Sequence, residues 1–408
     1  MTKSARLKNV LLGTVLAACA GLAFSSPADA QAKKYHVYLS MSYSGNGWQT
    51  ETSNLIKAIA ATPPYDKMVE LKTVISGTDV QAQASAYESM ISAGADAIIT
   101  FPISATGLNR SVRHACDKHV LFYTYSGTVT EPCARTVSFI TAGFAQNTAQ
   151  WLVNKLDGKG NIFLDRGVPG NSVDKMDYDA AMSVFSKYPG IKIIAEYYGM
   201  WNSQTTQQET AKALAAHPDV NGIFGENGED GILKAMLAAS MQKLVPLTGE
   251  HTNGFRLALA NPELQKRGFT GVSSGDPIWT SAYAFKLMME ELTGKRTVTV
   301  HNIEVPLPWV PADKIKVCEG STIENGCNAF SADLVPDSFN TEIFNPALTP
   351  EMSVDSALHG TPTPGATIQP LPADVVKEAP NVPGVNCEKC EAPADLYKLS
   401  VVTPTVQP

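Results

Sequence analysis

The chain has 408 residues, of which 44% are hydrophobic and 17% are charged. This length allows two or three domains, and this composition can bury hydrophobic cores, so disorder throughout the chain is excluded. The 32 lysines and arginines and the 39 aspartates and glutamates give a formal net charge of −7. An acidic chain lacks the basic surface that nucleic-acid-binding proteins use, so we expect no nucleic acid among its partners.

The N-terminus has the pattern of an export signal. Basic residues precede an apolar run over residues 10–24, and Ala28 and Ala30 supply the small residues of a cleavage site. The run is too short to be a structural transmembrane helix. We predict a signal peptide over residues 1–30 and a periplasmic location. Lipidation of Cys19, which would anchor the chain to a membrane, is the less favoured alternative because the five residues after Cys19 remain apolar.

The cysteines fit an exported protein. Without Cys19 there are six, an even number that suits disulfides in an oxidising compartment. Proximity in sequence favours the pairs Cys116–Cys133, Cys318–Cys327 and Cys387–Cys390, although six cysteines permit 15 connectivities. A spacing such as Cys387-x-x-Cys390 also occurs in redox motifs and in half zinc sites, but a second ligand pair and a βαβ context are missing. A structural disulfide is therefore the favoured interpretation, and we expect no metal site.

Apolar, β-rich runs alternate with helical periodicity along most of the chain. The first series of predicted elements is strand 35–41, helix 48–61, strand 69–75, helix 80–93, strand 95–101, helix 106–118, strand 120–125 and strand 136–141. The second series is helix 144–157, strand 161–165, helix 172–188, strand 191–196, helix 204–216, strand 221–225, helix 229–240, strand 244–248 and strand 268–273, before helix 278–294 and strand 299–305. Nearly continuous apolar strands, each followed by a helix, indicate parallel sheets covered on both faces.

Two such series predict an α/β protein with two doubly wound lobes. We place the first lobe at residues 31–142 plus 275–310 and the second lobe at residues 143–274. The chain should then cross between the lobes three times, near Ala142-Gly143, near Gly275-Asp276 and near Val305, to form a three-segment hinge. Residues 311–408 are a Pro-rich, Cys-containing extension, since residues 341–408 alone hold 11 of the 26 prolines.

Four stretches carry a family resemblance: HVYLSMSYSGNGWQT, GADAIITFP, HPDVNGIFGENGEDGILKAM and TGVSSGDPIWTSAYAFKLMMEELTGK. Together they resemble the periplasmic sugar-binding proteins of the ribose- and galactose-binding type (type I periplasmic binding proteins), which are exported receptors of ABC importers. The resemblance covers residues 35–308. It implies a monomer without a cofactor that captures a sugar or polyol between its lobes and delivers it to an ABC permease. The alternative is a receptor of the same fold that presents a signal molecule to a membrane sensor.

The resemblance places the ligand contacts at the ends of the predicted strands. The candidates are Ser44, Asn46, Trp48, Phe101, Tyr125, Ser126, Asp177, Trp201, Asn227, Glu250, His251 and Asp276. Trp48 and Trp201 match aromatic stacking positions of the family, so we expect them to sandwich the ligand from opposite lobes. Ordinary structural roles stay open: core packing for the tryptophans, a helix cap for Asn227, surface pairing for Asp177 and a solvated loop for His251.

The chain departs from the ribose-binding pattern in its charged residues. Tyr125 and Ser126 stand where that relative has an Asp-Arg pair, and Asp177 stands where an arginine is expected. Carboxylates cannot reproduce the bidentate contacts of guanidinium groups, so ribose itself is not the expected ligand. Asp177, Glu250 and Asp276 predict an acidic cleft that disfavours anions. We therefore expect a neutral or positively charged ligand.

Motifs for catalysis are scarce. The seven histidines are scattered, and the sequence contains neither an H-E-x-x-H motif nor a P-loop. We therefore expect a binding protein and not an enzyme.

Overall fold

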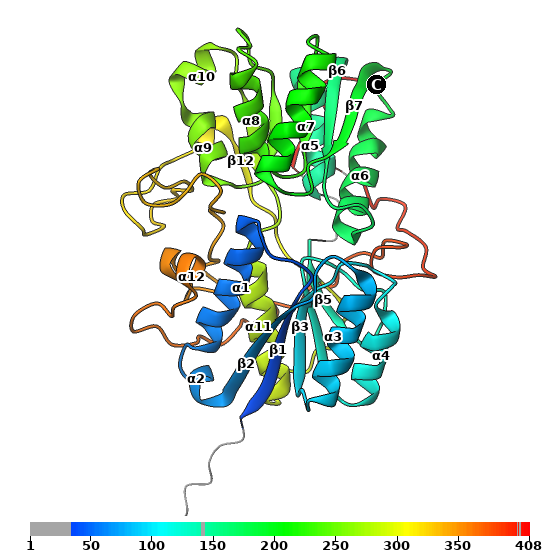
Figure 1. Cartoon of the computed structure of the whole chain (residues 1–408), viewed down its shortest axis with the longest axis vertical. Coiled ribbons are helices and arrows are strands. Elements are labelled where there is room, and N and C mark those ends of the chain that lie inside the picture. The colour runs from blue at the N-terminus through cyan, green and yellow to red at the C-terminus, as the bar shows by residue number, and fades with distance from the viewer. Residues whose placement is uncertain (1–33, 140–142, 398, 400) are drawn as a thin grey trace, which may run out of the picture. The chain divides into compact units, whose positions relative to one another are not determined.

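The computed structural model describes residues 34–139, 143–397, 399 and 401–408. The expected signal peptide, Cys19 and Ala142 lie outside these residues. Two six-stranded sheets organise the described chain, and helices cover both faces of each (Figure 1). The predicted fold class, an α/β protein with two mainly parallel sheets, is confirmed.

The first sheet is parallel throughout and has the strand order β11-β5-β4-β3-β1-β2. Its strands are β1 (Tyr35–Met41), β2 (Val69–Ile75), β3 (Ala97–Phe101), β4 (Leu121–Tyr125), β5 (Arg135–Ser138) and β11 (Asn302–Glu304). The helices are α1 (Gly47–Ala60), α2 (Tyr65–Met68), α3 (Val80–Ser92), α4 (Asn109–Asp117) and α11 (Trp279–Leu292). Every residue of the central strand β3 is buried, as expected for a parallel strand between two helical layers.

The second sheet has the order β12-β10-β9-β8-β6-β7, and its edge strand β12 is antiparallel to β10. Its strands are β6 (Lys159–Arg166), β7 (Gly190–Tyr198), β8 (Gly222–Gly225), β9 (Leu247–Gly249), β10 (Gly271–Ser274) and β12 (Trp309–Pro311). The helices are α5 (Gly143–Lys155), α6 (Ser172–Phe185), α7 (Ser203–Ala216), α8 (Glu229–Ala238), α9 (Asn253–Ala260) and α10 (Pro262–Lys266). Helices α5 and α6 pack together, as do α7 and α8, so the sheet has a hydrophobic core on each face.

The chain passes from one sheet to the other three times before the extension. Strand β5 in the first sheet is followed by α5 of the second, and β10 in the second is followed by α11 of the first. Strand β11 then precedes β12, which joins the second sheet. We did not predict β12, and the first-lobe boundary that we placed at residue 310 falls within it. We hereafter call residues 34–139 with α11 and β11 the first lobe, and residues 143–274 with β12 the second lobe.

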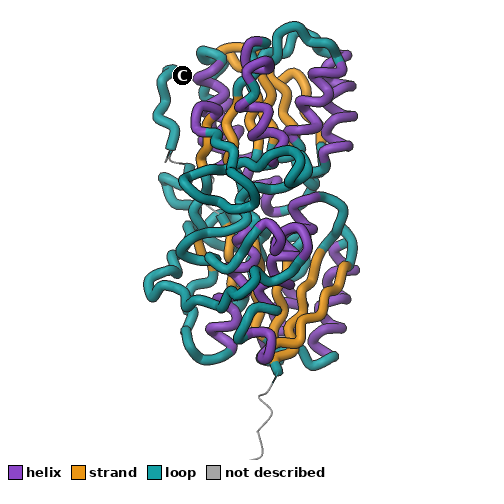
Figure 2. Tube along the Cα trace, turned by 90° about the vertical axis from the view of Figure 1, so that its left-hand side faces the viewer, coloured by secondary structure: helices purple, strands orange, loops and turns teal. Residues whose placement is uncertain are grey.

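After β12 the extension, which begins with the short helix η1 (Ala312–Lys314), packs first on the second lobe and then on the first. The fully buried Arg256 of α9 donates to the Asn328 carbonyl (2.6 Å) and pairs with Glu342 (2.7 Å). The Asn340 main-chain and side-chain amides donate to Glu51 of α1 (2.9 and 2.8 Å). Figure 2 shows these loops between the two sheets, on the side that faces the viewer.

The rest of the extension follows the first lobe and ends on the second. Its helix α12 (Val354–His359) lies beside α1 (Figure 1). Glu351 forms a buried ion pair with Lys286 of α11 (2.9 Å). Near the C-terminus, the Val406 carbonyl accepts a hydrogen bond from the Tyr188 hydroxyl of the second lobe (3.0 Å). The extension therefore contributes to the cores of the lobes along its length.

The burial of Glu51, which accepts hydrogen bonds from Asn340, makes stability depend on pH. Burial raises the pKa of Glu51 to about 8, although the Asn340 amides act in the opposite direction. The unfolded chain releases this proton near pH 4.5 and the folded chain retains it to about pH 8, so the free energy of unfolding should fall between these values. We expect Glu51→Gln to reduce that fall in urea unfolding at pH 5, 6.5 and 8. If the free energy of unfolding of Glu51→Gln falls with pH as much as that of the exposed control Glu263→Gln, this assignment is wrong.

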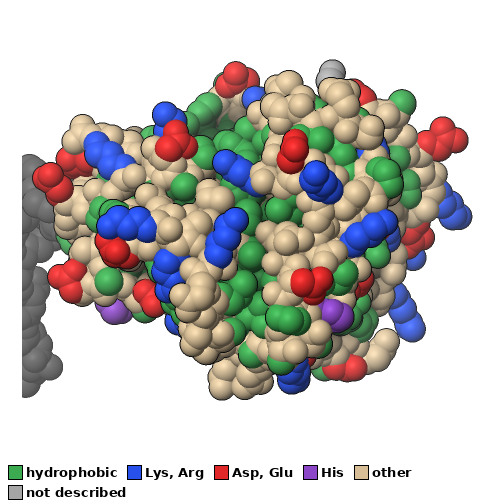
Figure 3. Space-filling view, turned by 90° about the horizontal axis from the view of Figure 1, so that it is seen from above, with side chains coloured by type: hydrophobic (Ala, Val, Ile, Leu, Met, Phe, Trp, Pro, Cys, Tyr) green, Lys and Arg blue, Asp and Glu red, His purple; other side chains and the backbone are tan. Residues whose placement is uncertain are grey.

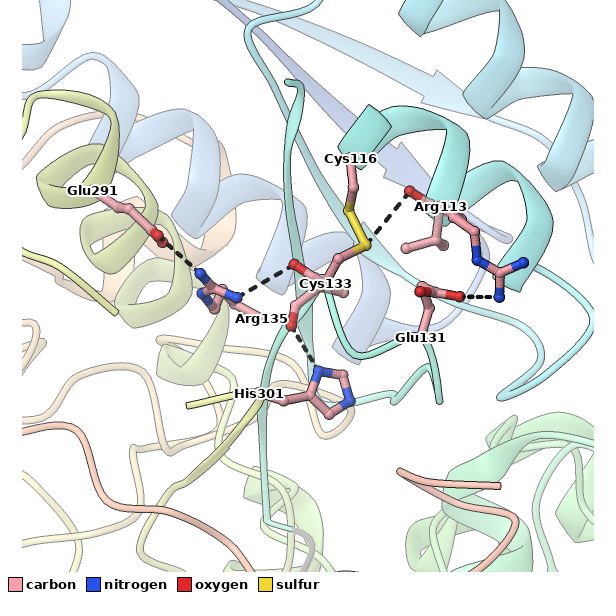
Figure 4. The surroundings of a disulfide bond; sticks show 9 residues. Arg113, Cys116, Glu131, Cys133, Arg135, Glu291 and His301 are labelled. Atoms are coloured by element: carbon pink, nitrogen blue, oxygen red, sulfur yellow. Dashed lines mark hydrogen bonds and ion pairs between the residues drawn. A yellow bond between two sulfur atoms is a disulfide. The ribbon is translucent and has the colours of Figure 1, made fainter. Parts of the chain in front are cut away.

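Three disulfides join the cysteine pairs that sequence proximity favoured. They are Cys116–Cys133, Cys318–Cys327 and Cys387–Cys390. The first ties the end of α4 to the loop before β5 (Figure 4). Beside it, the Arg135 guanidinium contacts Glu291 of α11 (3.2 Å) and the Cys133 carbonyl (3.3 Å). The disulfide therefore lies in a network that connects both helical layers of the first lobe.

Acidic and basic side chains are interspersed over the face seen in Figure 3, so this face has no extended basic patch. Among the described residues, the structure contains no helix that is both long and apolar enough to cross a membrane.

Candidate functional site

A cavity lies between the two lobes where strands of both sheets end. Its lining residues are Tyr43, Asn46, Trp48, Phe101, Val173, Trp201, Asn227, Glu250 and Asp276. Most of them come at or just after the carboxyl end of a parallel strand, where loops of an open α/β sheet converge. The cavity has about 350 Å³ of space not occupied by atoms, a volume that includes some open solvent. We call it the ligand cavity.

The first lobe supplies an aromatic wall to the ligand cavity. The Trp48 ring lies at the start of α1 and packs against Phe101 (ring centroids 5.4 Å apart) and Tyr125 (6.1 Å). The Trp48 indole N–H donates to the Asp276 main-chain carbonyl (3.1 Å). The indole is therefore fixed by aromatic neighbours and by one hydrogen bond.

The second lobe supplies Trp201, which lies between β7 and α7. Its backbone has a φ of 51°, and its indole N–H donates to Glu226 (3.2 Å). A glycine makes room for the ring, since a Cβ atom at Gly167 would lie 2.1 Å from the indole. A strained turn and a close approach thus hold the indole at the cavity.

Asn46 connects the two lobes at the cavity. Its side-chain oxygen caps α1 by accepting from the Gln49 amide (2.8 Å), which leaves the side-chain NH₂ free to point outward. That NH₂ donates to the Trp201 carbonyl (3.0 Å). One side chain therefore both begins the helix that carries Trp48 and bridges to the opposite lobe.

The remaining polar wall consists of hydrogen-bond acceptors and one amide. The Asn227 side chain donates to the Glu250 carboxyl group (3.0 Å). Asp276 follows β10, and its Oδ1 atom has no hydrogen-bond partner among the described residues. No lysine or arginine belongs to the described residues that line the cavity. The site thus offers carboxyl oxygens without a basic partner.

Burial controls the ionisation of these groups. It raises the pKa of Asp276 to about 8, and it raises the pKa of Glu250 well above its ordinary value, with further contributions from Glu229 and Asp276. His251 lies behind the cavity, where its Nε2 atom contacts the Asp276 carbonyl (2.7 Å) and burial lowers its pKa to about 4. His251 is therefore neutral at pH 7 and supplies no positive charge to the site.

A second set of buried carboxyl groups lies behind Trp201. Burial raises the pKa of Glu226, and the charges of Asp177, Asp174 and Asp165 raise it further, whereas Arg166 lowers it. The Asp177 pKa is also raised well above its ordinary value, first by burial and then by Asp174 and Asp276. More buried carboxyl groups therefore lie near the cleft than the sequence indicated, and their raised pKa values favour the neutral form.

The predicted contact residues occupy three kinds of place. Seven line the ligand cavity: Asn46, Trp48, Phe101, Trp201, Asn227, Glu250 and Asp276. Tyr125, Ser126, Asp177 and His251 are buried but do not line it, and Ser44 is exposed on the loop before α1. Sequence reasoning missed the lining residues Tyr43 and Val173. Tyr43 could have been found, since it comes two residues after the end of β1, whereas Val173 enters from the first turn of α6.

Neither a metal centre nor a nucleophile stands out. Among the described residues, no cluster of histidine, cysteine, aspartate or glutamate is placed to hold a metal ion. Gly271 to Gly275 has the G-x-S-x-G spacing of a hydrolase, but Ser273 is fully buried within β10. Its hydroxyl accepts from Arg256 (2.9 Å) and donates to the Glu250 carbonyl (2.6 Å), so it has a structural role.

Comparison with known proteins agrees with this architecture. The xylitol-binding protein of Mycolicibacterium smegmatis is 28% identical over 217 residues, which are 52% of this chain and 58% of that protein, so the chain matches less than two thirds of the relative's length. A solute-binding protein of an ABC transporter from Thermobispora bispora superposes with a TM-score of 0.64 at 22% identity, covering 83% of this chain and 99% of that one. A periplasmic solute-binding protein from Actinobacillus succinogenes with bound D-allose has a TM-score of 0.57 at 20% identity, covering 69% and 99%.

The family model for the periplasmic binding protein domain matches residues 37–296. That range holds both sheets except β11 and β12, together with every residue that lines the ligand cavity. The chain belongs to the periplasmic binding protein domain family.

Proposed function

We propose that this protein captures a sugar or related polyol between its two lobes in the periplasm and delivers it to an ABC permease in the inner membrane. The observation that carries the proposal is the ligand cavity, in which Trp48 and Trp201 come from opposite lobes beside amide and carboxyl groups. Flat aromatic faces suit the C–H surfaces of a polyol, and the polar groups accept hydrogen bonds from its hydroxyls. The protein acts without catalysis, as a monomer, after removal of residues 1–30.

The three crossings between the lobes support a hinge. Ligand enters while the lobes are apart, and closure brings Asn46 to the Trp201 carbonyl, which excludes water from the cavity. Gly275 has a φ of 156° at the second crossing, a torsion open to glycine, and a Cβ atom there would lie 2.5 Å from Glu250. Asp276, which lines the ligand cavity, is thereby carried on the second crossing itself.

A thermal-shift screen tests the proposed function directly. The purified protein would be heated with pentoses, hexoses, their alditols and glycerol, each at increasing concentration. A ligand at 100 times its Kd adds about 2.7 kcal/mol to stability, which raises the melting temperature by a readily measured amount. No shift with any neutral sugar or polyol would contradict the proposal.

The charge of the ligand should follow from the carboxyl groups of the cavity. Burial raises the pKa of Asp276 to about 8, so above that pH its carboxylate faces the ligand without a basic partner, and an anion would meet like charge in a site of low dielectric constant. We expect xylonate to bind at least about tenfold more weakly than xylitol in titration calorimetry at pH 9, where Asp276 is ionised, and 1-amino-1-deoxyxylitol to bind at least as tightly as xylitol.

Charge-neutral variants provide the control for this prediction. Glu250→Gln and Asp276→Asn should reduce the difference in affinity between xylonate and xylitol. The exposed substitution Glu263→Gln should leave that difference unchanged. Equal binding of the anion and the polyol by the unaltered protein would show that these carboxyl groups do not set the ligand charge.

A further inference from the structure

A second hollow opens beside the ligand cavity, and the C-terminal extension forms one of its walls. This outer hollow has about 1100 Å³ of space not occupied by atoms and shares Asn46, Trp48, Trp201 and Asn227 with the ligand cavity. We propose that the outer hollow is a subsite for a second hydroxyl-rich unit of the ligand. The protein then takes glycosides or disaccharide-sized compounds in preference to single sugars. This inference rests on the proposed function and specifies its ligand class.

The wall that the extension contributes is held from both lobes. On the second lobe, the Gly254 amide at the start of α9 donates to the Asp337 carbonyl (2.8 Å), and a Cβ atom at Gly254 would lie 2.7 Å from the Asp337 side chain. On the first lobe, both amide groups of Asn340 donate to Glu51 of α1. Segment 336–340 is therefore fixed beside the cavity, as the wall of a binding site has to be.

The chemistry of the outer hollow differs from that of the ligand cavity. Apart from the shared residues, its side chains are mostly polar and include Asn202, Ser203, Gln204, Gln207, Asp337 and Ser338. Amide and hydroxyl groups both donate and accept hydrogen bonds, which matches the hydroxyls of a sugar. Asn340 also lines the hollow, and its Oδ1 atom has no hydrogen-bond partner among the described residues. The unpaired Asn340 acceptor, together with side chains that both donate and accept hydrogen bonds, suits a hydroxylated unit better than an apolar substituent.

The two hollows adjoin at shared lining residues. Trp48 and Trp201 line both, so a ligand unit held between the indoles would lie next to the outer hollow. On the far side, Lys234 of α8 lies 4.0 Å from Asp337 of the extension, and it pairs with Asp230 at 2.8 Å. A second unit would thus contact α7, α8 and the extension together. The two spaces together offer more room than the ligand cavity alone.

Pairs of compounds that differ by one sugar unit test this inference. Titration calorimetry on the full protein would compare sorbitol with maltitol and xylose with xylobiose. We expect the two-unit compound of at least one pair to bind at least about tenfold more tightly than its one-unit partner. Three single substitutions should each weaken the binding of the two-unit compound several-fold and leave the Kd of its one-unit partner within about twofold: Gln204→Ala, Gln207→Ala and Asp337→Ala. Glu263→Ala on α10, which is exposed and distant from the site in sequence, serves as the matched control.

The possible results separate the inference from the proposed function. If one-unit compounds bind and two-unit compounds bind equally or more weakly, the outer hollow is only an entrance and the inference is wrong, while the proposed function stands. The inference is also wrong if the three variants weaken both members of a pair alike. If neither member of any pair binds, and the thermal-shift screen is also negative, the proposed function itself fails.

Discussion

Replacing Lys286 with methionine is expected to lower the free energy of unfolding by about 3–5 kcal/mol. The Lys286 ammonium group contacts Glu351 of the extension (2.9 Å) and donates to the Leu348 carbonyl (2.8 Å). The two charged side chains are 1% and 2% exposed, so removal of one leaves the other as an uncompensated buried charge. Urea unfolding of the whole protein measures this change in free energy. Its size shows how much the contact between the extension and α11 contributes to stability.

Two further variants make this result specific. The double substitution Lys286→Met with Glu351→Leu removes both charges, so it should regain a large part of the lost stability, although the Gln369 amide loses its acceptor on Glu351. Lys266→Met breaks an exposed ion pair with Glu263, whose side chains are 71% and 77% exposed, and should change stability by less than about 0.5 kcal/mol. If Lys286→Met costs no more than Lys266→Met, the extension does not pack on α11 as described.

The two sheets could be predicted from the sequence because their central strands are buried on both faces. A segment such as AIITF in β3 has continuous apolar character, and each such strand is followed by a periodic helix. The three-residue strand β12 was missed because its sequence, WVP, is too short for any periodicity to register. Helix α9 was missed because only three residues separate it from β9, and it lies within a segment that we had left without an element.

The extension and the site show where sequence reasoning reaches its limit. Asn340 contacts Glu51 across 289 residues of sequence, and no local pattern reports such a pairing. In the site, the positions after the strands could be predicted, but the directions of side chains could not. Glu226 and Asn227 are adjacent, yet Asn227 lines the ligand cavity and Glu226 lies behind Trp201. Asp177 likewise faces other carboxyl groups from within α6 and does not reach the cavity wall.

Removing either tryptophan of the ligand cavity should have the largest effect on binding. We expect Trp48→Ala and Trp201→Ala each to weaken the binding of one polyol, the tightest-binding one in the thermal-shift screen. The expected loss in titration calorimetry is about 2 kcal/mol of binding free energy, or roughly 30-fold in Kd. Both indoles are 8% exposed and line the cavity from opposite lobes, so each loses a ring face that no neighbour can replace. Phenylalanine at either position retains a flat face and should restore part of the affinity.

The control for these variants is Trp151→Ala. Trp151 lies on α5, where the Lys155 ammonium group is 5.5 Å from its ring centroid, and it does not line the ligand cavity. Its removal should leave the Kd within about twofold. Loss of the Trp48 indole, in contrast, also removes one hydrogen bond from the Asp276 carbonyl, and loss of the Trp201 indole unpairs Glu226. Circular dichroism of each variant separates a lost contact from a lost fold. If both cavity variants are folded and bind as the Trp151 variant does, the ligand does not lie between the two indoles.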